Sequence, residues 1–381
     1  MKVAVVTNIL SPYRISYFEE LNKQVEELTI VLMARSHKGR DWELGQYGFR
    51  TIYLNGFHVK PKNHPISLHY INYGVIRCLK TINPDIVVNG GFGATNILTF
   101  IYCKLFKKKY IGWGELSYFD NALSSYLKKS IRRIMSTRSD GTIASSIKSK
   151  ECFEFYGADP SKILVTTMPV DIRSISRLAE QYRLDSDYSA LKNKFGTPVL
   201  ISVGRLSKEK GLDHLINIFE KVKASLPDAA LLIVGDGPLR SHLETTVQKK
   251  NLSQVHFPGF LQTEKLIQYL VISDLFLFTT MRDPFGAVLS EAMACRVPVI
   301  ASHHAYASWD LIEDTQTGYL IDPTDYDASH GKIMECLSRT KESKKRMTQL
   351  AYDKVYPSNC ENTAKKTAEF LHQILNTGQK K

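Results

Sequence analysis

The strongest chemical signal in the chain is a pair of acidic residues, Asp283 and Glu291, eight positions apart in the run Asp283-Pro-Phe285-Gly286-Ala287-Val-Leu-Ser-Glu291. The proline and Gly286 predict a loop, and residues 287–294 predict a helix. Eight residues are a little over two helical turns, so one carboxylate belongs to the loop and the other to the helix. Both can accept hydrogen bonds from sugar or ribose hydroxyls, and free amides at the start of the helix favour an anion.

Two cations, Arg205 and Lys210, follow the apolar run Val199–Val203 and precede a helical stretch. Gly204 stands between the run and the cations, and glycine lets a ligand approach the backbone closely. A diphosphate is stabilised by two cations beside a helix N-terminus. Taken alone, the same pattern also fits a surface loop on which Arg205 and Lys210 are simply exposed to solvent.

Two further turns follow apolar runs, one at Gly235 after Ala230–Val234 and one at Phe260 and Leu261 after Val255–Phe257. Turns of this kind also follow strands in α/β proteins without any role in ligand binding. Ligands of open α/β sheets bind at the carboxyl ends of the strands, so these turns are expected beside the cations and the acidic pair.

Short apolar runs alternate with helical stretches along the whole chain, which predicts βαβ units with parallel sheets. The expected strands are Val3–Thr7, Leu28–Met33, Ile86–Asn89, Tyr110–Trp113, Thr142–Ala144, Val199–Val203, Ala230–Val234, Val255–Phe257, Leu275–Phe278 and Val297–Ala301. We expect an α/β protein with two Rossmann-like domains facing each other across a cleft. The expected boundaries are 1–172 for the first domain, 173–196 for a linker and 197–359 for the second, with a helix over about 360–381 packing back on the first.

The chain of 381 residues carries a formal net charge of +12, which concerns its partners rather than its fold. Lys128, Lys129, Arg132 and Arg133 surround an apolar helical face of Leu127, Ile131, Ile134 and Met135. This pattern predicts a helix on an anionic membrane surface; an ordinary amphipathic helix with a solvated basic face remains the alternative. A nucleic-acid partner is not expected, because no recognised binding motif accompanies the charge.

The targeting and cysteine patterns favour a reduced, cytoplasmic protein. We find neither a signal peptide nor an apolar run of the ~18 residues that a membrane span needs. The six cysteines show no CxxC spacing and no accompanying histidine cluster, so neither a disulfide framework nor a zinc site is expected.

In this order and spacing, the four loops resemble the family 4 glycosyltransferases, which are retaining enzymes of GT-B fold. Residues 145–171 and 310–323 are also similar to that family. The resemblance implies that Arg205 and Lys210 hold the donor diphosphate, and that Asp283 replaces a sugar-binding glutamate. It further implies that Glu291 holds the ribose, with the other donor contacts at Gly204, Gly235, Phe260, Leu261, Phe285, Gly286 and Ala287.

The chain also departs from the family pattern. Asp283 is shorter than the usual glutamate, and Arg296 stands where glycine is common, so that turn is expected to be made differently. His303, His304 and Tyr306 replace a loop that usually contains glycine. The N-terminal loop ends in Tyr13 and Arg14, resembling enzymes of surface-polysaccharide synthesis, and paired glycines occur instead at Gly90 and Gly91. Tyr13, Arg14, Gly91 and Glu115 are the expected acceptor-side residues.

The expected function is retaining transfer of a hexosyl-type sugar from a UDP- or GDP-sugar, UDP being favoured, to a glycan or lipid-linked glycan of the cell surface. The catalytic residues would be Arg205, Lys210, Asp283 and Glu115, with electrostatic stabilisation of the leaving diphosphate as the main effect and Arg14 a further candidate for it. No metal and no cofactor are expected, since the cations neutralise the diphosphate. A nucleotide-sugar epimerase of the same fold is the alternative; a dehydrogenase is disfavoured because no GxGxxG follows the first strand.

Overall fold

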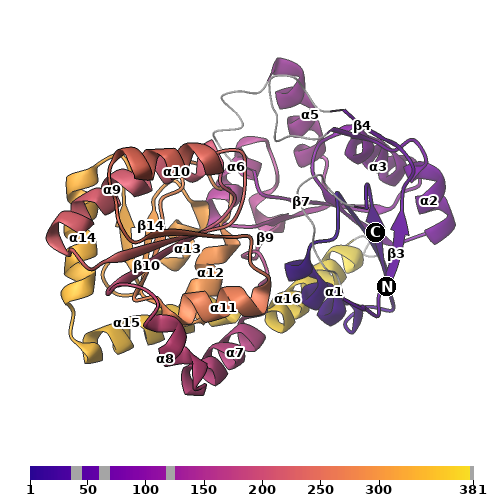
Figure 1. The fold of residues 1–381 in the computed structure, drawn as a ribbon. Coiled ribbons are helices and arrows are strands. Elements are labelled where there is room, and N and C mark those ends of the chain that lie inside the picture. The colour runs from indigo at the N-terminus through magenta and orange to yellow at the C-terminus, as the bar shows by residue number, and fades with distance from the viewer. Residues whose placement is uncertain (36–44, 60–68, 117–124, 378–381) are drawn as a thin grey trace. The chain divides into compact units, whose positions relative to one another are not determined.

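The computed structural model describes residues 1–35, 45–59, 69–116 and 125–377. The chain forms two compact units, Met1–Asp171 with Cys360–Lys381, and Ile172–Asn359 (Figure 1). None of the described helices combines the length and the apolar character that a membrane crossing requires.

The first unit is built on a parallel sheet with the strand order β3-β2-β1-β6-β7-β8-β9. Its strands are β1 Lys2–Thr7, β2 Glu27–Leu32, β3 Arg50–Tyr53, β6 Ile86–Gly90, β7 Lys109–Gly114, β8 Gly141–Ala144 and β9 Ile163–Val165, and a separate antiparallel pair is β4 Phe57–Val59 with β5 His69–Ile71. Its helices are α1 Pro12–Asn22, α2 Val75–Ile82, α3 Ala94–Leu105, α5 Tyr126–Thr137, α6 Ile147–Phe155, the 3-10 turn η1 Pro160–Lys162 and α16 Cys360–Asn376.

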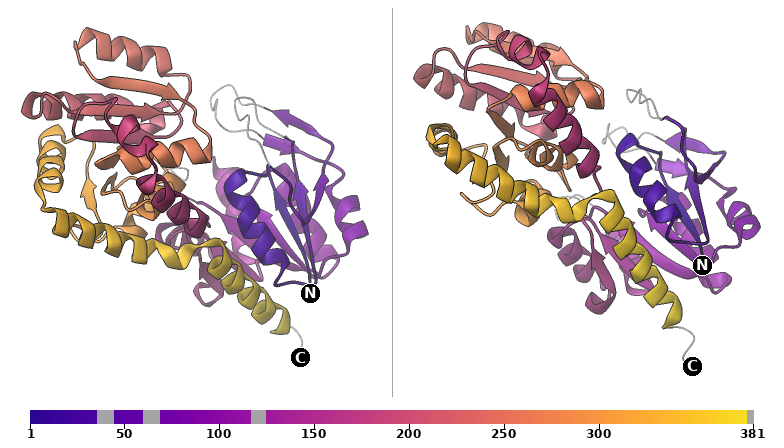
Figure 2. Two further views of the ribbon diagram at one scale, coloured as in Figure 1. Left: turned by 60° about the horizontal axis from the view of Figure 1, so that its bottom comes forward. Right: turned by 90° about the horizontal axis from the view of Figure 1, so that it is seen from below.

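Successive side chains of β1 point to opposite faces of the sheet, so the core of this unit has two layers. Val3 and Val5 pack in one cluster with residues of α1 and α16, whereas Ala4 and Val6 pack in another with residues of α2, α3 and α5. Both faces of the strand are therefore buried, as expected for a central parallel strand. Figure 2 shows the C-terminal helix α16 beside α1, and the Tyr17 hydroxyl donates to Thr367 Oγ1 at 3.2 Å across this contact.

The second unit contains a parallel sheet with the order β12-β11-β10-β13-β14-β15. Its strands are β10 Val199–Val203, β11 Ala230–Val234, β12 Val255–Gly259, β13 Leu275–Phe278, β14 Val299–Ser302 and β15 Tyr319–Ile321. Its helical segments are α7 Ile172–Leu184, α8 Asp187–Lys192, η2 Lys208–Lys210, α9 Leu212–Ser225, α10 Arg240–Lys249, α11 Thr263–Ile272, α12 Ala287–Ala294, α13 Tyr306–Leu311, α14 Tyr326–Ser338, α15 Lys341–Val355 and η3 Tyr356–Ser358. The two sheets confirm the expected α/β architecture of two Rossmann-like domains.

The stretch 173–196, interpreted above as a linker, is largely helical and groups with the second unit. Helix α7 buries Ile172, Ile175 and Ala179, and it packs against α11 and α12. The helix looks polar in sequence because its other faces carry charged residues, and only every third or fourth residue meets the core.

Candidate functional site

The residues expected to hold the donor lie at the carboxyl ends of β10, β11, β12 and β13, which are consecutive strands in the sheet. The turns after β10 and β11 pack so closely that only glycine fits at position 235. Gly235 has a φ of 132°, and a Cβ there would lie 1.9 Å from the carbonyl oxygen of Gly204. Because Val203 pairs with Val234 in the parallel register, Gly204 and Gly235 follow their strands at neighbouring positions, with their backbones in contact.

Lys210 and Asp283 meet at the centre of this edge, although 73 residues separate them in sequence. The Lys210 ammonium donates to Asp283 Oδ2, and both side chains are mostly buried, with exposed fractions of 21% and 12%. The ammonium also lies 5.6 Å from the centroid of the Phe278 ring. A cation held in a partly desolvated position interacts more strongly with an anion than one in bulk water.

Glu209, which the sequence did not indicate, fixes the position of Lys210. Its backbone carbonyl accepts three hydrogen bonds, from the amides of Met281 and Arg282 at 2.8 and 3.1 Å and from the Thr280 hydroxyl at 2.8 Å. Its carboxylate accepts from the Ser207 hydroxyl at 2.7 Å. The loop that carries Lys210 is thereby tied to the loop that carries Asp283.

Asp283 also organises its own loop. Its Oδ1 accepts from the Phe285 amide at 3.0 Å, so this amide, one of the expected donor contacts, forms a hydrogen bond within the loop. Gly286 has a φ of 91° and caps α12, and a Cβ there would lie 2.6 Å from the Phe278 ring. On its far side the Asp283 backbone pairs with Ala305, and its carbonyl accepts from the Tyr306 amide at 3.1 Å.

The remaining expected donor residues differ in environment. Glu291 on α12 is half-buried, and burial raises the pKa of its carboxyl from 4.5 to about 7. Arg205 is exposed, and the Phe260 side chain at the end of β12 is 54% exposed. Both can therefore turn toward a ligand without breaking core packing.

Arg296 corrects one sequence-based expectation. It adopts a φ of 51°, the left-handed conformation in which glycine commonly ends a helix. The amide of Arg296 donates to the Met293 carbonyl at 3.0 Å and that of Val297 to the Ala292 carbonyl at 3.1 Å, which is a Schellman motif. The expectation that this turn is made differently from a glycine turn is therefore wrong.

The side chain explains how arginine is accommodated at position 296. Its guanidinium lies 4.0 Å from the centroid of the Tyr352 ring and donates to Ser176 and Glu180 at 2.9 and 3.1 Å. These contacts join α12, α7 and α15. They offset the strain of a positive φ, which is about 1 kcal/mol or more.

In the first unit, the structure brings two expected acceptor-side residues together at the carboxyl ends of β1 and β7. The Arg14 guanidinium lies 3.6 Å from Glu115 Oε1, donates to Thr7 Oγ1 at 3.1 Å and lies 4.6 Å from the centroid of the Trp113 ring. Tyr13 is half-buried, with its ring 5.8 Å from the same guanidinium. The arrangement presents a fixed cation beside a carboxylate.

Gly91 lies at the end of β6, between these two strands in the sheet. Its φ is 127°, and a Cβ would come within 3.3 Å of Asn96 Oδ1. Asn96 in turn accepts from the Gly93 amide and donates to Asn89. This buried amide network holds the glycine loop in place at the start of α3.

The apolar residues of helix α5 do not share one environment, although the sequence places them on a single face. Met135 is buried and Ile131 half-buried, whereas Leu127 and Ile134 are 69% and 49% exposed. Lys128, Lys129 and Arg133 are exposed, but Arg132 lies against Tyr156, with its guanidinium 5.8 Å from the ring centroid and 3.4 Å from the hydroxyl. Arg132 therefore belongs to the packing of α5 rather than to its outer surface.

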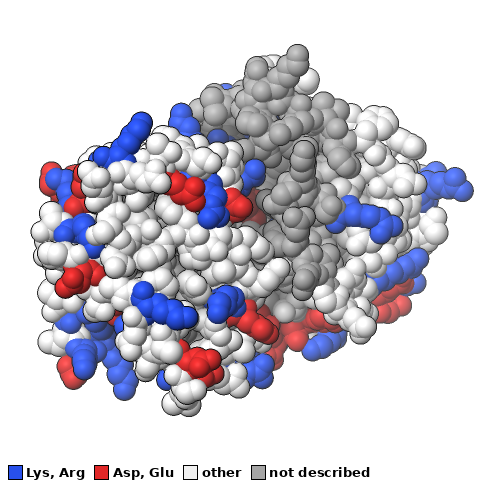
Figure 3. Space-filling view, viewed as in Figure 1, with Lys and Arg blue, Asp and Glu red and all other residues white. Residues whose placement is uncertain are grey.

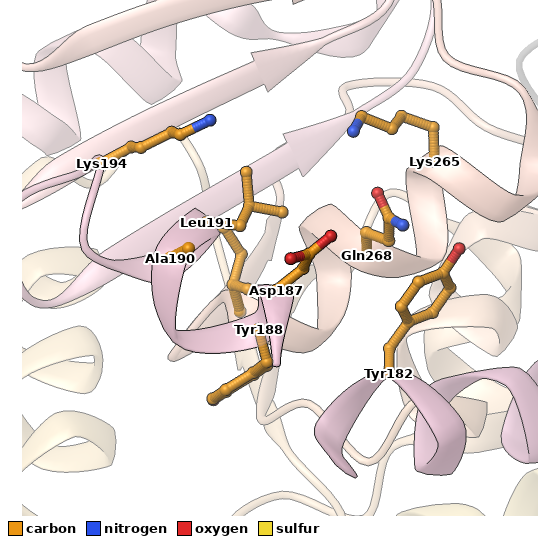
Figure 4. Close-up of a pocket in the computed structure, with 9 residues that line it drawn as sticks. Tyr182, Asp187, Tyr188, Ala190, Leu191, Lys194, Lys265 and Gln268 are labelled. Carbon is orange, nitrogen blue, oxygen red and sulfur yellow. The ribbon is translucent and has the colours of Figure 1, made fainter. Parts of the chain in front are cut away.

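Two other surface features do not involve the residues expected to bind the donor. A cavity of about 250 Å³ is lined by residues of α7, α8 and α11. Figure 4 shows Lys194, Lys265 and Asp187 among the side chains that line it. Figure 3 shows acidic side chains interspersed with lysine and arginine over the visible face of the second unit. That face lacks the continuous basic stripe of a nucleic-acid interface.

Comparison with known proteins finds a family match within the second unit. Residues 187–354 match the family of glycosyl transferases group 1. The chain is 25% identical over 284 residues to an uncharacterized glycosyltransferase of Methanocaldococcus jannaschii, covering 68% of this chain and 66% of the relative. It is 26% identical over 210 residues, 55% of this chain and 53% of the relative, to a Campylobacter jejuni N-acetylgalactosaminyltransferase acting on N-acetylgalactosamine-N,N'-diacetylbacillosaminyl-diphospho-undecaprenol.

The fold as a whole is also shared with a solved structure. Anabaena HepE in complex with UDP and glucose superimposes with a TM-score of 0.76 at 18% identity, covering 98% of this chain and 99% of that one. The aligned stretches span about half to two thirds of the two sequence relatives. The GT-B architecture expected from the sequence is therefore confirmed over nearly the full length.

Proposed function

We propose that this chain transfers a sugar from a nucleotide-sugar donor to a glycan or lipid-linked glycan. The proposal is supported by the match of residues 187–354 to the glycosyl transferases group 1 and by the GT-B fold that the chain shares with HepE. The observation that carries the proposal is the Lys210–Asp283 pair at the carboxyl ends of β10 and β13. It places a cation for a diphosphate and a carboxylate for sugar hydroxyls in contact, within loops whose glycines allow close packing of the backbone.

In the proposed reaction, the bond between the anomeric carbon and the diphosphate breaks while the acceptor oxygen bonds to that carbon. The acceptor proton passes to the leaving diphosphate. Lys210 and Arg205 stabilise the charge that develops on this leaving group, which is the type of interaction that contributes most to such reactions. Asp283 and Glu291 bind sugar and ribose hydroxyls.

We propose a UDP-sugar as the donor and retention of the anomeric configuration, in line with the family that the motifs resemble. HepE was crystallised with UDP and glucose, which supports UDP as the first nucleotide to test. A product of inverted anomeric configuration, seen by NMR, would overturn retention.

The acceptor side of the proposal rests on the first unit. Arg14, held by Thr7, Glu115 and Trp113, offers hydrogen-bond donors to acceptor hydroxyls or phosphate, and Glu115 accepts from hydroxyls. The Campylobacter relative acts on a lipid-diphosphate-linked sugar, which supports a lipid-linked glycan of cell-surface polysaccharide synthesis as the acceptor class, used on the cytoplasmic face of a membrane.

The decisive experiment combines binding and turnover. Thermal stabilisation of the full chain by a panel of UDP-, GDP- and ADP-sugars identifies the donor, because only a bound ligand raises the melting temperature. Lys210→Ala should then fold normally but lose at least about a hundredfold in transfer rate. Lys208→Ala removes an exposed lysine two positions away and serves as the matched control.

Near-normal transfer by Lys210→Ala would refute the assignment of this lysine. An epimerised donor formed without any acceptor would instead identify an epimerase of the same fold.

We also propose that α5 docks on an anionic membrane. Tyr126, Leu127 and Ile134 are 87%, 69% and 49% exposed, and the exposed Lys129 and Arg133 lie on the same helix, a composition suited to a lipid interface. Vesicles with anionic lipid should bind the chain more tightly than neutral vesicles at moderate salt. Equal binding to both would remove the membrane from the proposal.

A further inference from the structure

Two histidines and an aspartate converge at the ends of β14 and β15, outside the residues assigned to the donor. His303 and His304 directly follow β14, and Asp322 directly follows β15. One ligand atom from each of the three side chains lies within 4.8 Å of the others. The parallel pairing of Ser302 with Ile321 brings these positions together, although 18 residues separate Asp322 from His304.

Three hydrogen bonds hold the backbone of the two histidines in place. The His303 amide donates to the Ile321 carbonyl at 3.1 Å, and the His304 amide donates to Ser302 Oγ at 3.1 Å. The His303 carbonyl accepts from the Trp309 indole at 2.8 Å. The turn therefore presents both imidazole rings, whose centroids lie 4.1 Å apart, from a rigid base.

Asp322 is oriented in the same way. Its Oδ1 accepts from the amide and the hydroxyl of Thr324 at 2.9 and 2.7 Å. Both bonds end on the same oxygen, which leaves Oδ2 to coordinate an ion. Hydrogen bonds of this kind orient carboxylate ligands in metal sites.

We propose that His303, His304 and Asp322 form a binding site for Zn²⁺. Two imidazoles and one carboxylate are a donor set that suits zinc, whereas Mg²⁺ and Ca²⁺ prefer oxygen ligands throughout. Bonds of about 2.1 Å in tetrahedral geometry require ligand atoms about 3.4 Å apart. Side-chain rotations that move the ligand atoms by on the order of 1 Å would bring them from their present spacing of up to 4.8 Å to this value. A water molecule would be the fourth ligand.

The site adjoins the proposed donor loop without being part of it. Ala305 and Tyr306 follow His304 directly and pair with the backbone of Asp283. Bound Zn²⁺ therefore tethers the segment that supports Asp283. The cations that face the diphosphate, Arg205 and Lys210, lie on the β10 loop, so this metal does not replace them.

The test is a calorimetric titration of ZnCl₂ into the full chain in a non-chelating buffer, together with melting temperatures. Zn²⁺ should bind at one site and raise the melting temperature, and MgCl₂ at the same concentration should not. His304→Ala and Asp322→Asn should each weaken Zn²⁺ binding by at least about tenfold. His242→Ala is the matched control, because His242 lies 2.7 Å from Asp213 in a pair of only two candidate ligands.

Unchanged Zn²⁺ affinity in both ligand variants, or an equal loss in the His242 control, would show that histidines elsewhere bind the metal and would overturn the proposal. If a ligand variant does not fold, Co²⁺ provides a second measurement on the unmodified chain. A visible absorption band of a low-coordinate Co²⁺ ion, displaced by one equivalent of Zn²⁺, supports the site, and its absence contradicts it.

Discussion

Burial of Glu291 makes the stability of the second unit depend on pH. Its pKa is raised from 4.5 to about 7 by desolvation, so the folded chain holds a proton that the unfolded chain has released. The resulting stabilisation is fully present below pH 4.5 and is lost as pH rises through about 7. Glu291→Gln, which is neutral at every pH, should remove this dependence.

The size of the effect follows from the shift. From 4.5 to about 7 is about 2.5 pH units, and each unit corresponds to about 1.4 kcal/mol, or about 3 kcal/mol in all. Because Glu291 is only half-buried, we expect about 2 kcal/mol between pH 5 and pH 8. For a unit of this size, that is a change of about 4–8 °C in melting temperature.

Differential scanning calorimetry of the wild type and of Glu291→Gln at pH 5 and pH 8 measures this effect. The variant should gain about 4–8 °C relative to the wild type between the two values, and Glu264→Gln, at an exposed glutamate on α11, should not. A constant difference across this range would refute the argument. If ribose hydroxyls donate to Glu291, UDP binding near pH 7 should also release protons, seen as a buffer-dependent enthalpy that Glu291→Gln lacks.

Three further predictions concern other parts of the chain. Gly235→Ala should destabilise the second unit by about 2–4 kcal/mol in thermal unfolding, because its Cβ would overlap the Gly204 carbonyl at a positive φ, whereas Gly331→Ala on α14, where the added Cβ meets open space, should be neutral or stabilising. Arg14→Met should lower kcat/KM for the acceptor at least about tenfold while leaving the thermal shift with nucleotide unchanged; an equal loss of nucleotide binding would contradict its acceptor-side role. Diphosphate neutralisation should need no metal, so a loss of transfer in EDTA that is restored by Mg²⁺ or Mn²⁺ but not by Zn²⁺ would contradict its assignment to Arg205 and Lys210.

Much of the fold could be predicted from hydrophobic patterning. The strands β10, β11 and β13 were predicted with their observed bounds, because central parallel strands are buried on both faces and appear as continuous apolar runs. Strand β3, whose residues are half-buried or exposed, and the short strands β9 and β15 were not predicted. Helix α7 was taken for a linker because few of its residues meet the core.

The candidate site divides in the same way. The sequence by itself determined the residue types, since glycines, cations and acids after apolar runs are local patterns that place them at strand ends. Only the tertiary structure decided that Lys210 contacts Asp283, that Glu209 joins their loops and that Asp322 meets His303 and His304. It also decided that Arg296 adopts a glycine-like φ, held by contacts on α7 and α15. These outcomes depend on which strands become neighbours in the sheet and on side-chain contacts between distant segments, which local patterns do not specify.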